Sequence, residues 1–341
     1  MWFAMNIDDI LTKLRAEARS EREKGDSFER LMIRFLKTYP VYDSRFTDVW
    51  QWRDFAGRGG IAEGDTGIDI VARTKEGQFW AVQAKFYQEE TLISKADLDG
   101  FLATSGRSFN FSGKRISFAK RLLVSTTNAW SSNAETAIRD QTPPVSRISL
   151  TDLRAEGVDW KRLDEGFYGN AARPARKELR DYQREAVEKA REHYASRARG
   201  KVILPCGTGK TLQSLKIAES ETDGRGFVLF LAPSIALVGQ TLREWSVDAA
   251  KPFFGFCVCS DPTVSEGSSR LSDEEDGDSY RTVDLPLPVT TSPKLIAEYL
   301  SQGARLHGDR LTIVFSTYHS AGAVSAGAKK AKVSFDIMVC D

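Results

Sequence analysis

Residues 67–85 read GIDIVARTKEGQFWAVQAK, a stretch that is typical of a β-hairpin. The segments 68–73 and 79–86 are rich in the β-branched and aromatic side chains that favour strands. The loop between them, residues 75–77, ends in a glycine, where a tight turn needs a left-handed backbone. The sequence therefore predicts two antiparallel strands joined by a three-residue loop.

One face of this hairpin is polar. Symmetry about the middle of the loop places Asp69 opposite Gln83, with Lys85 as its diagonal neighbour. The opposite face carries side chains that suit a core: Trp80, Val82 and Phe86. A carboxylate and an amide oxygen can hold a hard divalent cation and place an ammonium group beside it. The alternative is a surface hairpin with a solvated polar face, and spacing alone leaves both interpretations open.

Length and composition indicate an ordinary globular chain. Its 341 residues suggest about two domains, and hydrophobic residues make up 41%. The net charge of +1 gives no global basic pattern for nucleic acid, so any DNA contact must come from local patches.

The four cysteines include no C-x-x-C pair and the three histidines are scattered, which argues against a zinc site or a disulfide framework. No apolar run approaches the roughly 18 residues of a membrane span, and no signal peptide is recognisable, so we expect a reducing cytoplasmic compartment and no membrane partner.

Residues 1–165 are expected to form an α/β domain around a small mixed sheet. The predicted helices cover 6–24, 26–39, 95–104 and 132–139, the last with Ser132 or Asn133 as its N-cap. The predicted strands besides the hairpin cover 49–52, 121–125 and 147–150. Their alternation with helices favours a sheet flanked by helices.

Glu29 has two interpretations. Gly25 interrupts the helical pattern and Asp26 can cap the second helix, so Glu29 fits a capping box. It can equally be a helix acid that projects toward the hairpin and supports a metal. Asp54 and Asp65 are either further ligands or turn formers, and the arginines of the loop 53–60 either touch phosphate or are solvated.

Three short motifs in this half resemble the Mrr-type branch of the PD-(D/E)xK nucleases: residues 25–31, Gly67-Ile68-Asp69 and Gln83-Ala84-Lys85. The resemblance implies a mixed sheet flanked by helices and Mg²⁺-dependent cleavage of phosphodiesters. It implies that Asp69 ligates the metal together with the Gln83 side chain and the Ala84 carbonyl. Lys85 would orient or activate water and Glu29 would assist. The neutral Gln83 should bind metal more weakly than an acid.

A phosphate loop is predicted in the second half. Residues 166–177 have the composition of a linker, 178–198 fit a helix and 201–204 a short strand. PCGTGKT follows at 205–211 and leads into a helix, although Leu204 replaces the first glycine of the longer pattern. Backbone N–H groups there can hold phosphate, with Lys210 for charge and the Thr211 hydroxyl for Mg²⁺.

The segments around this loop resemble the first RecA-like domain of superfamily 2 translocases. The resemblance rests on residues 180–183, 227–234, 313–318 and 335–341. It implies a parallel-sheet P-loop domain over 178–341, incomplete at its Walker B aspartate.

The same resemblance implies roles for single residues. Gln183 would read adenine and Asp341 would hold the Mg²⁺ water shell. The triphosphate would lie on Gly207, Thr208, Gly209, Lys210 and Thr211. Pro233, Ser234 and Thr317 would lie near DNA, or alternatively serve only as turn residues at strand ends.

The order of a nuclease followed by a motor is similar to that of ATP-dependent restriction enzymes. Three segments most resemble the type ISP restriction-modification enzymes of bacteria: WQWRDFAGRGG at 50–60, VCSDPTV at 258–264 and LPVTTSP at 287–293. We therefore expect a nuclease and leading ATPase portion that acts on foreign duplex DNA with Mg²⁺ and ATP.

Methyltransferase and target-recognition domains, and a second RecA-like domain, are expected in a longer polypeptide. Without that second domain, we expect no hydrolysis or translocation by this chain alone. The alternatives are a nuclease–helicase of phage defence or repair without a methyltransferase, and a binding remnant without turnover. The acidic segment 260–293 is expected to be a solvated loop that does not bind DNA.

Overall fold

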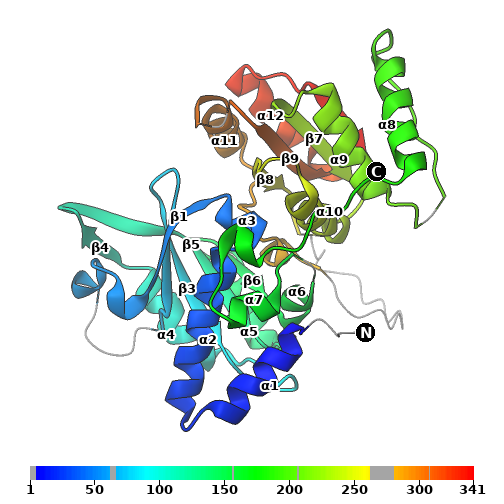
Figure 1. The fold of residues 1–341 in the computed structure, drawn as a ribbon. Coiled ribbons are helices and arrows are strands. Elements are labelled where there is room, and N and C mark those ends of the chain that lie inside the picture. Colours follow the sequence, from blue (N-terminus) through cyan, green and yellow to red (C-terminus); the bar gives the residue numbers. More distant parts are fainter. Residues whose placement is uncertain (1–4, 62–66, 156, 206, 262–279, 307) are drawn as a thin grey trace, which may run out of the picture. The chain divides into compact units, whose positions relative to one another are not determined.

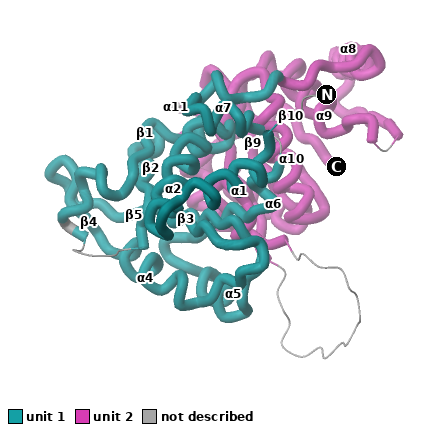
Figure 2. Tube along the Cα trace, turned by 60° about the horizontal axis from the view of Figure 1, so that its bottom comes forward, with its two compact units in different colours: residues 1–175 teal, residues 176–341 magenta. Residues whose placement is uncertain are grey.

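The computed structural model describes residues 5–61, 67–155, 157–205, 207–261, 280–306 and 308–341. It divides into two compact units, residues 1–175 and residues 176–341, coloured separately in Figure 2. The boundary falls within the segment 166–177 that was predicted as a linker.

The first unit is built on a six-stranded mixed sheet (Figure 1). Its strands run in the order β1-β2-β3-β5-β4, and β6 pairs with β5. The β3–β5 and β5–β6 pairs are parallel, whereas the others are antiparallel. The strands are β1 Phe46–Gln51, β2 Ile70–Thr74, β3 Phe79–Lys85, β4 Ser108–Phe111, β5 Lys114–Ser125 and β6 Val145–Ile148. The predicted mixed sheet is confirmed.

Helices flank this sheet. They are α1 Ile7–Glu17, α2 Glu21–Leu36, α3 Pro40–Asp43, α4 Ala96–Ser105, α5 Ser132–Ile138, α6 Leu150–Arg154 and α7 Trp160–Asp164. The apolar stripe of α2 is buried, with Phe28 stacked on Phe86 at a centroid distance of 5.0 Å. Phe28, Met32 and Leu36 are essentially inaccessible, so α2 closes the core over β1 and β3.

The first two helix boundaries were predicted wrongly. α1 ends at Glu17, and α2 begins at Glu21 with Ser20 as its N-cap, whose hydroxyl accepts from Glu23 N at 3.1 Å. Gly25 therefore lies inside a helix, because the Ser20 cap starts it before the glycine and the cost of an internal glycine is only about 1 kcal/mol. Asp26 is consequently not a cap.

Three smaller features also differ from expectation. Ser131, rather than Ser132 or Asn133, caps α5. The β4–β5 hairpin was not predicted, although its turn at Ser112-Gly113 has positive φ at both residues, as tight hairpins require. Strand β6 ends at Ile148, because Ser149 caps α6.

The second unit contains a four-stranded parallel sheet in the order β10-β7-β9-β8. The strands are β7 Gly226–Ala232, β8 Phe254–Val258, β9 Leu311–Thr317 and β10 Ile337–Cys340. The helices are α8 Asp181–Tyr194, α9 Lys210–Glu221, α10 Ile235–Asp248, α11 Pro293–Leu306 and α12 Ala321–Ala331. Short 3₁₀ turns in the two units are Trp52–Asp54, Arg58–Gly60, Gly169–Ala172, Thr282–Asp284 and Tyr318–Ser320.

Successive side chains of β7 point to opposite faces of this sheet, and helices pack on both faces. Leu229 and Leu231 pack in a cluster with Ile296 of α11 and Val324 of α12. Phe230 points the other way, onto Trp245 of α10, at a centroid distance of 5.4 Å. Helices on both faces are what a parallel sheet requires.

The strand predicted at 201–204 does not form. Val202 and Ile203 are 44% and 83% exposed, and this segment pairs with none of the strands that the structure describes. An extended segment without a ladder partner gains no sheet hydrogen bonds, so the apolar pattern alone does not make it a strand.

The predicted helix 178–198 is shorter, at Asp181–Tyr194. The acidic run 273–278 lies outside the described residues. Within the described part of the chain, no helix is long and apolar enough to cross a membrane.

Candidate functional site

The β2–β3 hairpin brings Asp69 onto the QAK segment. Its ladder runs from Ile70↔Val82 to Arg73↔Phe79, so the predicted register is confirmed. Asp69 lies one residue before β2, and its backbone N donates to the Val82 carbonyl at 3.0 Å. Its carboxylate Oδ2 accepts from Ala84 N at 2.7 Å. The acid therefore points at the backbone between Gln83 and Lys85.

Gln83 supplies an unsatisfied oxygen at this place. The residue is 3% exposed, and among the described residues its Oε1 has no hydrogen-bond partner. A buried polar atom without a partner costs about 1–3 kcal/mol unless something else binds it. A cation bound beside the Asp69 carboxylate would satisfy it, so the donor set fits a hard divalent metal.

Gly67 allows the backbone to approach this amide closely. Its φ is +65°, and a Cβ there would lie 2.8 Å from Phe101 N of α4 and 3.2 Å from Gln83 Nε2. Only glycine meets both demands. Within the described residues, no three His, Cys, Asp or Glu side chains gather as a metal cluster, so a cation bound at Asp69 would also need amide or carbonyl oxygens as ligands.

Lys85 ends β3 beside an acidic network. Its Nζ lies 6.0 Å from the centroid of the Tyr87 ring, and the Tyr87 hydroxyl donates to Asp97 Oδ1 at 2.8 Å. Ser94 donates to the other Asp97 oxygen through its N and Oγ, at 2.8 and 2.7 Å. Burial would raise the pKa of Asp97, but these hydrogen bonds and the Lys85 charge lower it overall. Burial and Asp97 raise the pKa of Tyr87 to about 12.

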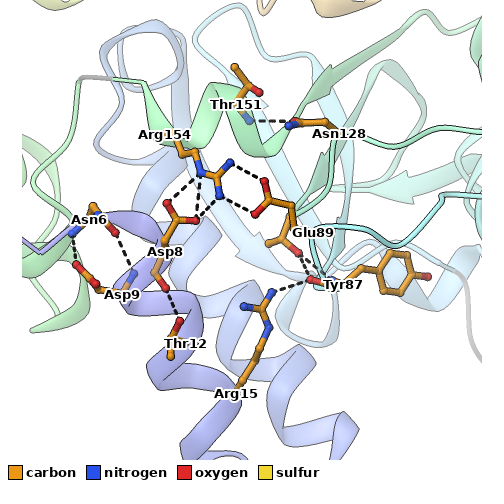
Figure 3. Close-up of polar contacts among 11 residues, drawn as sticks. Asn6, Asp8, Asp9, Thr12, Arg15, Tyr87, Glu89, Asn128, Thr151 and Arg154 are labelled. Atoms are coloured by element: carbon orange, nitrogen blue, oxygen red, sulfur yellow. Dashed lines mark hydrogen bonds and ion pairs between the residues drawn. The ribbon is translucent and has the colours of Figure 1, made fainter.

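The segment that follows Lys85 is anchored to α1 and α6 (Figure 3). Arg154 of α6 reaches both Asp8 of α1 and Glu89, with N···O distances of 2.8 Å. Arg15 Nη2 donates to the Tyr87 carbonyl at 2.8 Å. The Arg154 hydrogen bond lowers the pKa of Glu89. These contacts hold in place the segment that directly follows Lys85.

Glu29 faces a partner that sequence reasoning missed. Its carboxylate Oε2 accepts from Gln51 Nε2 at 3.2 Å, across from α2 to the end of β1. Burial raises the pKa of Glu29 above its ordinary value, and the Gln51 hydrogen bond opposes this only in part. Because α2 begins well before Asp26, the capping-box interpretation of Glu29 is wrong. A polar residue between two tryptophans, Trp50 and Trp52, was the available signal for Gln51.

The remaining acids and arginines of the loop are dispersed. Asp54 is exposed in the turn after β1, and Asp65 lies outside the described residues. Arg53 lies 3.4 Å from Asp26 Oδ2.

In the second unit, a glycine-containing loop precedes α9. Gly207 and Gly209 have φ of +74° and +79°, and α9 begins at Lys210. Thr211 is the next residue, and its carbonyl accepts from Trp245 Nε1 at 2.9 Å. Cys206 lies outside the described residues. The loop therefore leads directly into the N-terminus of α9, where free backbone N–H groups can bind an anion.

Gln183 of α8 contacts this loop. Its Nε2 donates to the Thr208 carbonyl at 2.8 Å, and its Oε1 accepts from Arg180 N at 2.9 Å. A Cβ on Gly209 would lie 2.6 Å from the same Nε2. The amide expected to read adenine is thus placed against the loop expected to bind phosphate.

The other predicted residues of the second unit lie at one edge of its sheet. Pro233 and Ser234 follow β7, Thr317 ends β9 and Asp341 follows β10, and these strands are parallel. Ser234 caps α10 by accepting from Leu237 N, and Thr317 Oγ1 donates to Ser320 Oγ at 3.2 Å. Both bonds are the strand-end turn chemistry that the sequence left open as an alternative.

Comparison with protein families divides the chain at the same place as the fold. Residues 37–169 match the family model described as restriction endonuclease. Residues 176–341 match the family model described as the res subunit of type III restriction enzymes. The search of curated proteins found no match.

Two solved structures are similar. The ATP-dependent Type ISP restriction-modification enzyme LlaBIII bound to DNA is 29% identical, with a TM-score of 0.76, over 98% of this chain and 20% of that one. A nuclease-deletion mutant of the Type ISP enzyme LlaGI with a DNA substrate mimic is 33% identical over 48% of this chain and 15% of that one, with a TM-score of 0.39. The chain thus spans about a fifth of the LlaBIII length.

Proposed function

Because this chain carries a restriction-endonuclease domain followed by a helicase-like domain, as in the Type ISP restriction-modification enzymes, we propose that it cuts foreign duplex DNA. In this proposal it is the nuclease and leading ATPase portion of an ATP-dependent restriction endonuclease of the bacterial cytoplasm. Methyltransferase and target-recognition domains would be partners in the same polypeptide.

The observation that carries the nuclease proposal is the buried Gln83 Oε1, which has no hydrogen-bond partner among the described residues and lies next to an acid held by Ala84 N. We assign Asp69, the Gln83 side chain and the Ala84 carbonyl to hold Mg²⁺. Bound there, the metal would supply Lewis acidity toward a phosphate oxygen and its own water. The Lys85 ammonium stabilises the charge that develops on phosphate, and Glu29 assists from α2.

ATP binding is assigned to the second unit. Gly207, Thr208, Gly209 and Lys210 would hold the phosphates. The Thr211 hydroxyl would bind the accompanying Mg²⁺, and Asp341 would hold its water shell. Gln183 contacts adenine. The observations that support this are the positive φ of both glycines and the contact between Gln183 and Thr208. Pro233, Ser234 and Thr317 remain proposed contacts of the DNA backbone.

Nicking of supercoiled plasmid tests the nuclease assignment. We expect Mg²⁺-dependent nicking by the wild type, and none by Asp69→Ala or Lys85→Ala, with ATP binding unchanged in both variants. Asp99→Asn removes a carboxylate from the exposed side of α4, where it pairs with Lys95, and serves as the matched control. DNA cleavage by Asp69→Ala would falsify the assignment. A wild type that never nicks, with or without ATP, would favour a binding protein without turnover.

A further inference from the structure

The side-chain amide of Gln51, the last residue of β1, lies between the Glu29 carboxylate and the Arg53 guanidinium group. The side chain is buried, at 8% exposure. Its Nε2 donates to Glu29 Oε2 at 3.2 Å, and its Oε1 accepts from Arg53 Nη2 at 2.8 Å. Both ends of the amide are therefore engaged.

Arg53 determines which way this amide faces. A guanidinium group only donates hydrogen bonds, so it takes the oxygen end and leaves the NH₂ end for Glu29. Arg53 also lies 3.4 Å from Asp26 Oδ2, and its side chain is 50% exposed. The resulting series of contacts, from Asp26 through Arg53 and Gln51 to Glu29, begins and ends on α2.

The same contacts are attached to the backbone that carries Asp69. Gln51 pairs with Ile70 in the β1–β2 ladder, and Trp52 N donates to the Asp69 carbonyl at 2.8 Å. Glu29 is therefore connected to Asp69 through a strand pair rather than through a long loop. A change at Gln51 acts on the acid of α2 without removing any backbone bond of Asp69.

A neutral donor suits Glu29 for a role beside a cation. An arginine or lysine in this place would orient the carboxylate and also cancel its charge. An amide orients the carboxylate and leaves its charge in place, so its attraction for a divalent cation or for a metal-bound water is retained.

We propose that Gln51 is a positioning residue, which orients the Glu29 carboxylate that the proposed function assigns to the nuclease site, and that Arg53 fixes the orientation of the Gln51 amide. This inference rests on the proposed function of the Asp69 site.

Gln51→Met tests the role, because methionine keeps the length of the side chain and removes both hydrogen bonds. Arg53→Met leaves Gln51 in place and frees its amide to rotate. Gln78→Met, at an exposed glutamine of the β2–β3 turn, is the matched control. Each variant is measured in the full chain for plasmid nicking, as kcat and KM for DNA, and for Mn²⁺ affinity by calorimetry without DNA.

We expect Gln51→Met to lower kcat about tenfold, the effect of one lost hydrogen bond, and to leave KM for DNA unchanged. Its Mn²⁺ affinity at the Asp69-dependent site should fall several-fold. Arg53→Met should change both quantities in the same direction by less, and Gln78→Met neither. A merely structural role would not separate kcat from KM.

Gln51→Met with the kcat and Mn²⁺ affinity of the wild type overturns the inference. If that variant fails to fold, Arg53→Met decides on the same criteria. Asp69→Asn tests the proposed nuclease site directly: unchanged nicking and Mn²⁺ binding in this variant overturn the proposed function itself. Loss in Asp69→Asn together with no change in Gln51→Met overturns only the role of Gln51.

Discussion

The Asp69 carboxylate accepts a hydrogen bond from the Ala84 backbone N at 2.7 Å, and this bond joins the residue before β2 to the end of β3. The last pair of the hairpin ladder is Ile70↔Val82, and one further backbone bond runs from Asp69 N to the Val82 carbonyl. The next contact between the two strands is made by the Asp69 side chain. One acid thereby satisfies a backbone donor next to Gln83, whose buried side-chain oxygen has no hydrogen-bond partner in the part of the chain that the structure describes.

Replacing Asp69 separates the structural part of this contact from the chemical part. Asp69→Ala leaves Ala84 N without its acceptor and should cost about 1–3 kcal/mol of stability. Asp69→Asn keeps an acceptor and should cost less. Both variants lose the charge, so both should lose Mg²⁺-dependent nicking. Calorimetric unfolding and plasmid nicking measure the two effects, and an Asp69→Asn variant with full nicking would contradict the metal assignment.

Replacing glycine by alanine at two positions of the first unit should change the stability of the fold in opposite directions. Gly67 has a positive φ and no space for a Cβ near Phe101 N, so Gly67→Ala should destabilise by about 1–3 kcal/mol. Gly25 lies inside α2 with nothing within 4 Å of its would-be Cβ, so Gly25→Ala should stabilise by about 0.5–1 kcal/mol. The same calorimetric transition should move down in one variant and up in the other. A downward shift for Gly25→Ala would contradict the continuous α2.

The hairpin was predictable because three local requirements agree there: strand-forming residues, a turn glycine and one apolar face. The contact of Asp69 with Ala84 N was not, since the ladder ends one residue earlier than its symmetry suggests. The partnership of Glu29 with Gln51 joins residues of α2 and β1, and no local pattern in the sequence encodes such a pair.

The errors have the same origin. Residues 201–204 have a strand pattern, but a strand forms only with a ladder partner, and the pattern carries no information about partners. Gly25 looked like a helix boundary, but the Ser20 cap and the burial of Phe28 and Met32 outweigh the small cost of one glycine. The loop at residues 207–209 was predictable, because glycine readily adopts the positive φ that Gly207 and Gly209 show there.

Glu29 should make stability depend on pH. Because its pKa in the folded state is raised above 4.5, the folded protein favours the protonated acid. That contribution is complete below pH 4.5 and is lost as pH rises through the folded-state pKa. Glu29→Gln cannot ionise, so its melting temperature relative to the wild type should rise between pH 4 and pH 8. Glu90→Gln, at an exposed site, gives the baseline. A pH-independent difference for Glu29→Gln would contradict the burial of this carboxyl.

Gln183 should contribute to nucleotide binding through both of its amide atoms. Its Nε2 donates to the Thr208 carbonyl and its Oε1 accepts from Arg180 N. Gln183→Ala removes both bonds, so the loop loses support, and under the proposed role adenine would also lose a polar partner. We expect ATP affinity to fall about tenfold, the equivalent of one hydrogen bond, and the preference for ATP over GTP to diminish.

Isothermal titration with both nucleotides measures the effect of Gln183→Ala. Glu188→Ala, on the exposed side of α8, is the matched control and should bind ATP as the wild type does. A uniform loss for ATP and GTP would mean that Gln183 only supports the loop, because a lost contact with adenine must weaken ATP more than GTP. An unchanged ATP affinity would contradict both roles.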